Sequence, residues 1–454
     1  MDGSIMHEGH ERRDVVILGA GIAGMTAAHR LREHDLVVLE AEPRVGGRKL
    51  SGGDSDAWFN LGAQLISSER MAALCRELGI ELISVSGSDF GFAVNGHFAR
   101  GATPQLLLAR MRISPTQKLD FALTAVRLRR KLHALQRMSA EQRAEIDGQT
   151  LQRLMGRVSP VTMELLETCC ESASGSTPYS MSGLYGLAYG LGLFLDPVTK
   201  QGLYGVRGGT QQVANTIAAG LPAGALRLGA TVTSVRQPGG EEVVVTYRGL
   251  GGDEQTISAR HCICALPAHA VLEVVEGVSP EKRAALEAAT PYTTTVSVAW
   301  AVPDGVSTPW DGVFIAPAAR FGTFNLITNY GYLAQQLDPR RGGYLNVVAS
   351  NTSALPDVDD ERFVALQHAE LVRLFPAAAQ LLDPQRAVIQ RWPQMALPRI
   401  REGFLSRRGA LRADEGNVCF CGDYTSEPGL PGANNSGHHA GEAVVRELAA
   451  LPAT

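Results

Sequence analysis

Apolar residues near the start of the chain form two short runs separated by a helix-like stretch. Residues 15–18 (VVIL) are continuous and β-branched, which is typical of a strand buried on both faces of a parallel sheet. Residues 22–33 are rich in Ala, Met, Leu and Arg and favour a helix, and residues 36–39 form a second apolar run. The pattern predicts a β-α-β unit.

Similar patterns return later in the chain. An amphipathic helix follows Gly208 and Gly209, and a strand is predicted at 231–235. The run HCICALP and residues 418–421 predict two further buried strands, the second followed by a C-terminal helix. The most apolar later stretch, 183–195, is interrupted by glycines and is too short to span a bilayer, so we expect a buried helix.

Composition narrows the class of protein. A chain of 454 residues exceeds what one core usually supports, which predicts two domains. The net charge of −4 predicts no binding to nucleic acid. The basic helix around 118–137 is interpreted as a solvated face, and we expect no membrane span. Residues 1–11 are polar and are expected to be a disordered leader.

Cysteine and histidine usage indicates neither disulfides nor a metal. The seven cysteines form no C-x-x-C pair, and an odd count argues against a secreted disulfide framework, so a cytoplasmic location is expected. His438 and His439 have no accompanying ligand cluster, and we predict no metal site.

The first strand ends in a nucleotide-binding pattern. Gly19, Gly21 and Gly24 have the spacing G-x-G-x-x-G between a predicted strand and a predicted helix, and Glu40 follows at the end of the next strand. Such glycines allow a tight turn, the approach of a pyrophosphate and close helix–strand packing, while the acid accepts hydrogen bonds from a ribose. The pattern predicts a dinucleotide but does not choose between NAD and FAD.

The residues after Glu40 point to FAD. Residues 40–48 read EAEPRVGGR, and Gly46, Gly47 and Arg48 could meet a pyrophosphate. This stretch resembles the flavin-containing amine oxidase superfamily, which includes protoporphyrinogen oxidases and, more distantly, phytoene-desaturase-like enzymes. The segment 417–448, with Gly422-Asp423 and Gly432-Ala433, resembles the closing flavin motif of that superfamily.

The resemblance implies an α/β fold in which a Rossmann-like FAD-binding domain is interleaved with an α+β substrate-binding domain. The FAD-binding domain is expected at 12–70, 203–290 and 414–450, and the substrate-binding domain at 71–202 and 291–413. The implied FAD-binding residues are Gly19, Gly21, Gly24, Glu40, Arg44, Gly47, Arg48, Gly62, Ala63, Val232, Gly422, Asp423, Gly432 and Ala433. Residues 394–417 contain no cysteine for flavin attachment, so FAD is expected to be bound non-covalently.

The resemblance also implies the chemistry: oxidation of a C–N bond of an amine or amide, of the kind found in secondary metabolism, by hydride transfer to flavin N5. Gln64 is expected beside N5, Trp392, Tyr185 and Tyr189 along the cavity, and Arg320 as an anchor for an anionic group. Two family features are absent. Thr295 stands where many relatives have a lysine, and Gly429 stands where monoamine oxidases have an aromatic residue.

Two other functions stay open at this point. One is C–C dehydrogenation of the protoporphyrinogen or phytoene kind, and the other is a flavin-binding scaffold without turnover. For the enzyme we expect a small-molecule substrate and O2 as the electron acceptor. The oligomeric state stays open, a homodimer being one option.

Overall fold

The computed structural model describes residues 11–196 and 202–450, so the predicted leader lies outside the described residues except for Glu11. The contacts divide the chain into two compact units. Unit 1 holds residues up to Arg48, Val213–Thr290 and the residues from Arg407, while unit 2 holds Lys49–Gln212 and Pro291–Ser406. The chain therefore crosses between units repeatedly, but residues 49–70 and 203–212, which the sequence analysis grouped with the FAD-binding segments, belong to unit 2.

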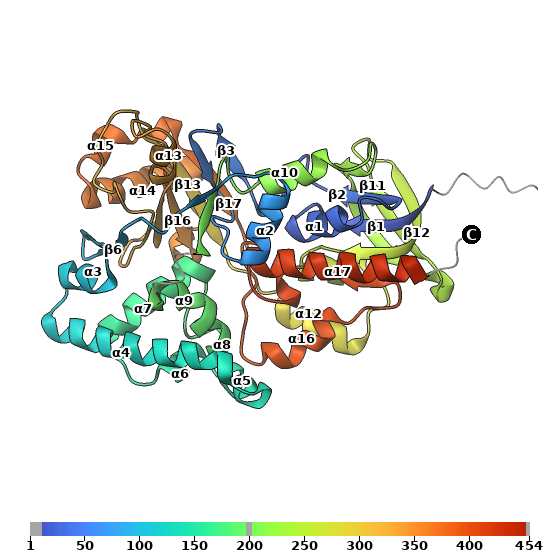
Figure 1. The fold of residues 1–454 in the computed structure, drawn as a ribbon, viewed down its shortest axis with the longest axis horizontal. Coiled ribbons are helices and arrows are strands. Elements are labelled where there is room, and N and C mark those ends of the chain that lie inside the picture. The colour runs from blue at the N-terminus through green and yellow to red at the C-terminus, as the bar shows by residue number, and fades with distance from the viewer. Residues whose placement is uncertain (1–10, 197–201, 451–454) are drawn as a thin grey trace, which may run out of the picture. The chain divides into compact units, whose positions relative to one another are not determined.

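A mixed seven-stranded sheet forms the centre of unit 1 (Figure 1). Its order is β10-β11-β12-β1-β2-β9, and β18 also pairs with β12. β1 pairs in parallel with both β2 and β12, as the apolar run predicted, while β10, β11 and β12 are antiparallel. The strands are β1 (Glu11–Leu18), β2 (Leu36–Glu40), β9 (Leu226–Leu228), β10 (Thr231–Arg236), β11 (Val243–Arg248), β12 (Glu254–Cys264) and β18 (Val418–Phe420).

Helices cover this sheet. α1 (Ile22–Arg30) follows β1 directly and ends three residues before the predicted boundary, and it packs against the C-terminal helix α17 (Leu430–Ala450). Their close pairing joins the first and last segments of the unit (Figure 1). Unit 1 also contains α11 (Ala268–Val274) and α12 (Pro280–Ala289). Two more helices, α10 (Gln212–Ala219) and α16 (Phe404–Arg412), begin in unit 2 and end in unit 1.

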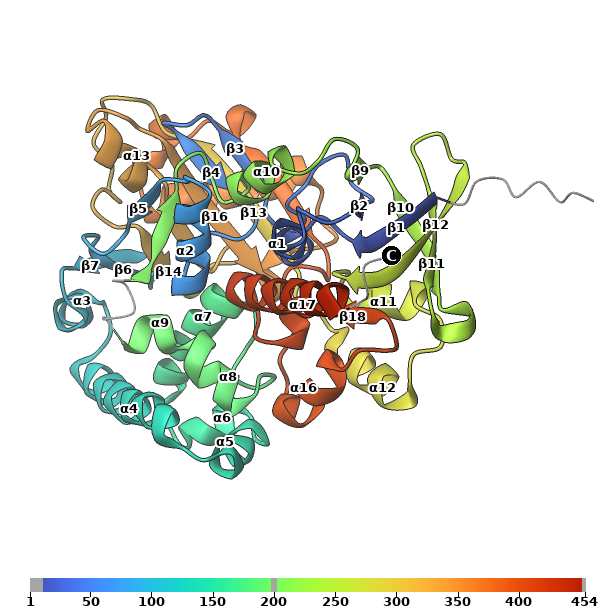
Figure 2. The ribbon, with the colours of Figure 1, turned by 45° about the vertical axis from the view of Figure 1, so that its right-hand side comes forward.

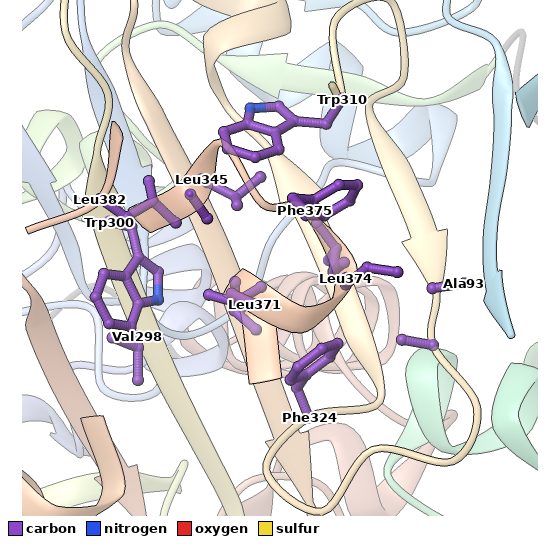
Figure 3. Packing of buried hydrophobic residues seen from close by; sticks show 14 of the residues in the cluster. Ala93, Val298, Trp300, Trp310, Phe324, Leu345, Leu371, Leu374, Phe375 and Leu382 are labelled. Carbon is purple, nitrogen blue, oxygen red and sulfur yellow. The ribbon is translucent and has the colours of Figure 1, made fainter. Parts of the chain in front are cut away.

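Unit 2 contains a five-stranded antiparallel sheet in the order β14-β15-β16-β13-β17. One face packs on a large apolar core, in which Trp300, Trp310 and Phe375 lie among leucines and valines (Figure 3). The strands are β13 (Thr295–Ala301), β14 (Ile315–Pro317), β15 (Leu326–Asn329), β16 (Tyr344–Ser350) and β17 (Val388–Trp392), and α13 (Gly331–Leu337), α14 (Asp360–Leu374) and α15 (Ala378–Leu381) accompany them.

The remaining part of unit 2 is mainly helical (Figure 2). It contains α3 (Pro104–Arg110), α4 (Pro115–Ala134), α5 (Ala140–Asp147), α6 (Leu151–Met155) and α7 (Pro160–Ser174). The predicted single helix at 183–195 is instead two short helices, α8 (Gly183–Tyr185) and α9 (Gly192–Leu195), joined by a wider π-type turn at 186–190. Repeated glycines favour such a break because they stabilise a regular helix poorly.

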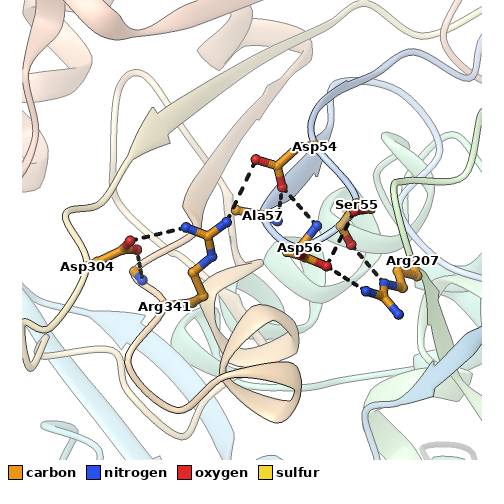
Figure 4. A network of polar contacts seen from close by, with 8 residues as sticks. Asp54, Ser55, Asp56, Ala57, Arg207, Asp304 and Arg341 are labelled. Atoms are coloured by element: carbon orange, nitrogen blue, oxygen red, sulfur yellow. Dashed lines mark hydrogen bonds and ion pairs between the residues drawn. The ribbon is translucent and has the colours of Figure 1, made fainter.

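Short hairpins complete unit 2. β3 (Ser51–Gly53) pairs with β4 (Trp58–Asn60), β5 (Leu82–Ser84) with β8 (Tyr204–Val206), and β6 (Phe90–Val94) with β7 (His97–Gly101), while α2 (Glu69–Glu77) precedes β5. Two arginines hold the turn between β3 and β4 (Figure 4). Arg207 bonds Asp56 at 2.6 Å, and Arg341 pairs with Asp54 at 3.8 Å. These contacts anchor residues 49–60 within unit 2.

Candidate cofactor and substrate sites

The acid at the end of β2 is held by backbone donors. Glu40 Oε2 accepts a hydrogen bond from the Ala20 amide at 2.6 Å, and Oε1 accepts one from Glu42 N at 2.9 Å. Glu40 is buried, and both bonds orient its carboxylate beside the turn between β1 and α1. A carboxylate oxygen can accept more than one hydrogen bond, so Glu40 retains capacity for a ribose hydroxyl.

The glycines of the turn between β1 and α1 differ in what a side chain at each position would contact. A Cβ placed on Gly24 would lie 2.0 Å from the Gly19 carbonyl oxygen, so Gly24 is required by the packing of the protein itself. A Cβ placed on Gly21 would meet no protein atom within 4 Å. Gly21 also precedes α1, whose first turn receives no side-chain cap. Space above an uncapped helix start suits a phosphate group.

The glycine pair after Glu40 lies close to this turn. Gly46 N donates to Ala20 O at 2.8 Å, and a Cβ on Gly47 would lie 3.2 Å from Gly21 Cα. Arg44, expected to contact FAD, donates to the Gly47 carbonyl oxygen at 2.9 Å. The two glycine motifs, 22 or more residues apart in the chain, therefore form one surface within unit 1.

Arg48 has an ion-pair partner that the sequence analysis did not foresee. Its two Nη atoms donate to the carboxylate of Asp423 at 2.8 and 2.9 Å. Asp423 is only 1 % exposed and begins a short 3₁₀ helix, η7 (Asp423–Thr425), directly after Gly422. The bidentate pair joins the N-terminal motif to the closing motif, so the charge of Arg48 is already balanced by the protein.

The other predicted FAD-binding residues lie in different elements, and two of them lie in unit 2. Val232 lies in β10 beside a β-bulge. Gly432 lies inside α17, where a Cβ would come within 1.8 Å of the Glu427 carbonyl oxygen, and the Ala433 amide donates to Gly429 O. Helix packing therefore explains Gly432, and α17 begins at Leu430 rather than at this glycine. Gly62 and Ala63 belong to unit 2.

The second candidate site lies on the unit 2 sheet. Side chains at paired register positions share a face, and the face opposite the apolar core carries polar residues among the apolar residues Ala299, Leu326, Val348 and Val388. We call its polar part the polar face; these residues are Thr295, Ser297, Thr328, Asn346, Ser350, Gln390 and Trp392. Four of these residues, Ser297, Thr328, Asn346 and Ser350, are buried, although they are polar. Buried polar rows of this kind are uncommon unless hydrogen bonds satisfy them.

Gln64 is held against the polar face by a closed hydrogen-bond network. Its Oε1 accepts from Tyr330 OH at 2.7 Å and from Asn346 Nδ2 at 3.2 Å, while its Nε2 donates to Asn60 O and Gly62 O. Burial raises the pKa of Tyr330, which therefore stays protonated and remains a donor. These four bonds use the hydrogen-bonding capacity of the Gln64 amide. The orientation of the Gln64 amide is thus fixed by the protein, and its expected place beside N5 stays a prediction.

Two atoms of the polar face have no hydrogen-bond partner among the described residues. Thr328 Oγ1 and Asn346 Oδ1 are buried and make no hydrogen bond to any described residue. The two residues are directly paired across β15 and β16, so their side chains project from the same face. An unmatched hydroxyl and carbonyl in the interior are costly unless a ligand or water bonds to them. The sequence analysis missed both residues, although alternation of polar and apolar residues in YLNVVAS is a usable signal.

Trp392 lies on the polar face, and its role as a cavity wall stays a prediction. Its Nε1 donates to the Leu61 carbonyl oxygen at 2.7 Å, which fixes the plane of the indole ring. Thr295, the residue at the position of the usual lysine, is its direct register partner. The structure therefore brings Trp392, Thr295 and Gln64 together, all within unit 2.

Lys49 is a buried cation that the sequence analysis did not single out. It is only 2 % exposed, and its Nζ donates to the Thr210 carbonyl oxygen at 3.3 Å. Desolvation lowers its pKa to about 7, an effect that nearby Cys75 partly opposes. Thr210 in turn donates to Asn60, so Lys49 adjoins the network around Gln64. A lysine after G-G-R gives no sequence signal of burial.

The remaining predicted substrate residues lie in or beside the helical part of unit 2. The rings of Tyr185 and Tyr189 stack with centroids 6.0 Å apart, and Tyr185 also meets Phe404 edge-on. Arg320 is exposed, and its Nε and Nη2 bond both carboxylate oxygens of Glu164 at 2.6 and 2.8 Å. Because Glu164 already balances this guanidinium, the expectation that Arg320 anchors an anionic substrate group is not supported.

Residues 11–196 and 202–450 contain no metal cluster, no membrane-spanning helix and no disulfide. No group of three or more His, Cys, Asp or Glu side chains there could hold a metal ion. No described helix is both long enough and apolar enough to cross a membrane. All seven cysteines are buried and free of disulfides.

The chain is similar to known flavin-containing proteins in family, sequence and fold. The family model described as flavin containing amine oxidoreductase matches residues 22–445. A protein of Mycobacterium tuberculosis that carries the name of a flavin-containing monoamine oxidase, AofH, is 29% identical over 257 residues. That match covers 52% of this chain and 54% of the relative, so the chain spans about half the length of that protein.

Solved structures share the fold at low sequence identity. Cyclohexylamine oxidase from Brevibacterium oxydans aligns with a TM-score of 0.78 and 21% identity, covering 96% of this chain and 99% of that one. Putrescine oxidase bound to putrescine aligns with a TM-score of 0.75 and 19% identity over the same shares. These likenesses show that the chain has the same mixed α/β fold.

Proposed function

Since the chain belongs to the flavin-containing amine oxidoreductase family, we propose that it oxidises a C–N bond of a small amine or amide to an imine or iminium. The family binds FAD, and unit 1 fits that cofactor. The space above Gly21, the carboxylate of Glu40 and the uncapped start of α1 would hold its ribose and pyrophosphate. When bound, FAD supplies a hydride acceptor.

The observation that carries the C–N assignment is the pair of unmatched polar atoms on the polar face. Asn346 Oδ1 would accept an N–H from the substrate, and Thr328 Oγ1 can either donate to or accept from the same group. A hydrocarbon polyene has no group to satisfy these atoms, so binding one would leave both buried and unbonded. The polar face therefore favours an amine or amide over a hydrocarbon polyene, and the reduction experiment below distinguishes both from a porphyrinogen, which also carries N–H groups.

Other residues of unit 2 would prepare this surface without touching the reacting atoms. Tyr330, Asn60 and Asn346 hold the Gln64 amide, which keeps the loop 61–64 in place. Trp392 would form a rigid apolar wall, because the bond from its Nε1 to Leu61 O restrains the ring. Excluding water from such a surface favours hydride transfer over side reactions.

Anaerobic flavin reduction tests the proposed reaction. The purified protein is mixed with a panel of amines, amides, a porphyrinogen and a polyene while the flavin absorbance is followed. We expect bleaching by an amine or amide, slowed several-fold by deuterium on the carbon beside nitrogen. Bleaching by the porphyrinogen or the polyene alone would assign C–C dehydrogenation instead, and no bleaching by any class would favour a non-catalytic scaffold.

A pair of threonine variants tests the polar face. Thr328→Val removes an oxygen that bonds no described residue, so it should weaken substrate binding about tenfold without lowering stability. Thr323→Val is the matched control, because Thr323 Oγ1 bonds Glu370. It should lower the melting temperature and leave substrate binding unchanged. Equal substrate affinity in Thr328→Val and the parent would remove the polar face from the substrate site.

A further inference from the structure

Helix α4 is apolar on two opposite sides. Its inner side carries Phe121, Leu128 and Leu132, which pack in or against the core of the helical part. Leu119, Leu123 and Val126, at spacings of four and three residues, lie on the opposite side. These three side chains are 61 %, 63 % and 51 % exposed. These three residues, which we call the stripe, do not contribute to the core. An exposed apolar stripe of this kind indicates a surface that contacts a partner or a membrane.

Cations surround this stripe. Arg130, four residues after Val126, continues it, while Arg127 and Arg129 lie on its two flanks at helical spacing. Residues 104–138 contain eight Lys or Arg and one acidic residue, a net charge of +7 in a chain whose total is −4. The single acid, Asp120, accepts bonds from Ser159 and Thr162 and so faces α7.

Several of these cations are not neutralised within the protein. Arg127 and Lys131 donate only to backbone carbonyl oxygens, those of Met155 and Leu154, in the hydrogen bonds identified. Arg130 and Arg137 form no ion pair with any residue in the described part of the chain. Their positive charge therefore remains available to an anionic partner. Figures 1 and 2 both draw α4 at the margin of the helical part, with α7 and α9 on its inner side.

We propose that the outer face of α4 docks on an anionic lipid surface. Leucine and valine side chains lie in the centre of this face with Arg127 and Arg130 beside them, whereas Arg129 on the other flank is paired with Asp196 at 3.3 Å. This arrangement of apolar and cationic groups suits the interface of a bilayer. The apolar groups enter the acyl boundary, and the long arginine stems reach the phosphate groups. Such docking lies in the interface plane and needs no membrane-spanning helix.

Vesicle flotation tests the docking of the holoprotein. We expect it to float with phosphatidylcholine vesicles containing about one-third phosphatidylserine, not with phosphatidylcholine alone, and to dissociate as NaCl rises to about 0.5 M. Leu119→Gln/Leu123→Gln and Arg130→Gln/Arg137→Gln should each lower the bound fraction at least about tenfold. Flavin content and flavin reduction should stay at parent values in both, since neither pair lies in the candidate sites.

Two control variants distinguish binding through the outer face of α4 from non-specific binding of exposed apolar or cationic residues to vesicles. Leu250, in unit 1, is 87 % exposed, and Arg340 is an exposed arginine in unit 2. Leu250→Gln and Arg340→Gln should float like the parent. The proposal is overturned if the parent does not float with anionic vesicles, or if the controls lose binding as much as the α4 variants. It is also overturned if sedimentation velocity shows a dimer that Leu119→Gln/Leu123→Gln disperses, because the stripe would then be an interface between copies.

Discussion

At the scale of single residues, Gly21 and Gly24 are expected to have different roles: Gly21 leaves space for a ligand, whereas Gly24 is required by the packing of the fold. Gly21→Val projects a side chain into space that no protein atom fills, so we expect a folded protein that loses FAD. Gly24→Val should instead lower stability, because its side chain would collide with Gly19 O. Flavin absorbance after desalting and the apo melting temperature measure the two effects. Full flavin occupancy in Gly21→Val would refute the placement of the pyrophosphate.

The lowered pKa of Lys49 predicts how the free energy of unfolding depends on pH. Its folded pKa of about 7 lies below the value of about 10.4 for an unfolded lysine, so the unfolded chain binds more protons between these limits. The unfolding free energy of the parent should therefore rise with pH relative to Lys49→Met, by up to about 1.4 kcal/mol per pH unit between pH 7 and 10. Below pH 7 the difference should be constant.

Urea titrations of both proteins at pH 6, 7, 8 and 9 measure this difference. Lys282, a second buried lysine whose pKa is lowered to about 8, is present in both proteins, so its contribution cancels in the comparison. Parallel pH profiles for parent and Lys49→Met would show that Lys49 remains charged in the folded protein.

At the scale of elements, the Arg48–Asp423 pair connects the loop after β2 with η7 before α17. Arg48→Met leaves the buried carboxylate of Asp423 without its cation, which should cost about 3–5 kcal/mol. Arg76→Met, which breaks an exposed pair with Glu69, should cost about 1 kcal/mol or less. Chemical denaturation of the apo variants compares them. Equal losses in the two variants would mean that the Arg48 pair does not join these elements energetically.

At the scale of the whole molecule, the cofactor should be releasable. None of the residues 394–417, where related enzymes attach flavin, is a cysteine, and the seven cysteines lie buried elsewhere. Acid precipitation should therefore leave FAD in the supernatant with its free absorbance spectrum. A yellow pellet that retains flavin after washing would demonstrate a covalent bond and contradict this expectation.

Features that depend only on residues close together in the sequence could be predicted from the sequence. The run 15–18, the glycines before α1 and the acid at the end of β2 required only local periodicity and spacing, and each lies where expected. Trp392 also lies on a polar sheet face. By contrast, the glycine-interrupted segment 183–195 divides into two short helices, because several weak helix formers act together there.

Tertiary structure decided everything that depends on partners distant in the chain. Arg48 could be interpreted as a phosphate ligand until folding placed Asp423, 375 residues later, within 2.8 Å. The amide oxygen of Gln64 accepts hydrogen bonds from Tyr330 and Asn346, and Glu164 neutralises Arg320, two sets of contacts that spacing along the chain does not indicate. The unmatched Thr328 and Asn346 become a pair only when β15 and β16 align. Spacing along a chain specifies local backbone geometry, whereas hydrogen-bond satisfaction and charge balance depend on which distant groups the fold brings together.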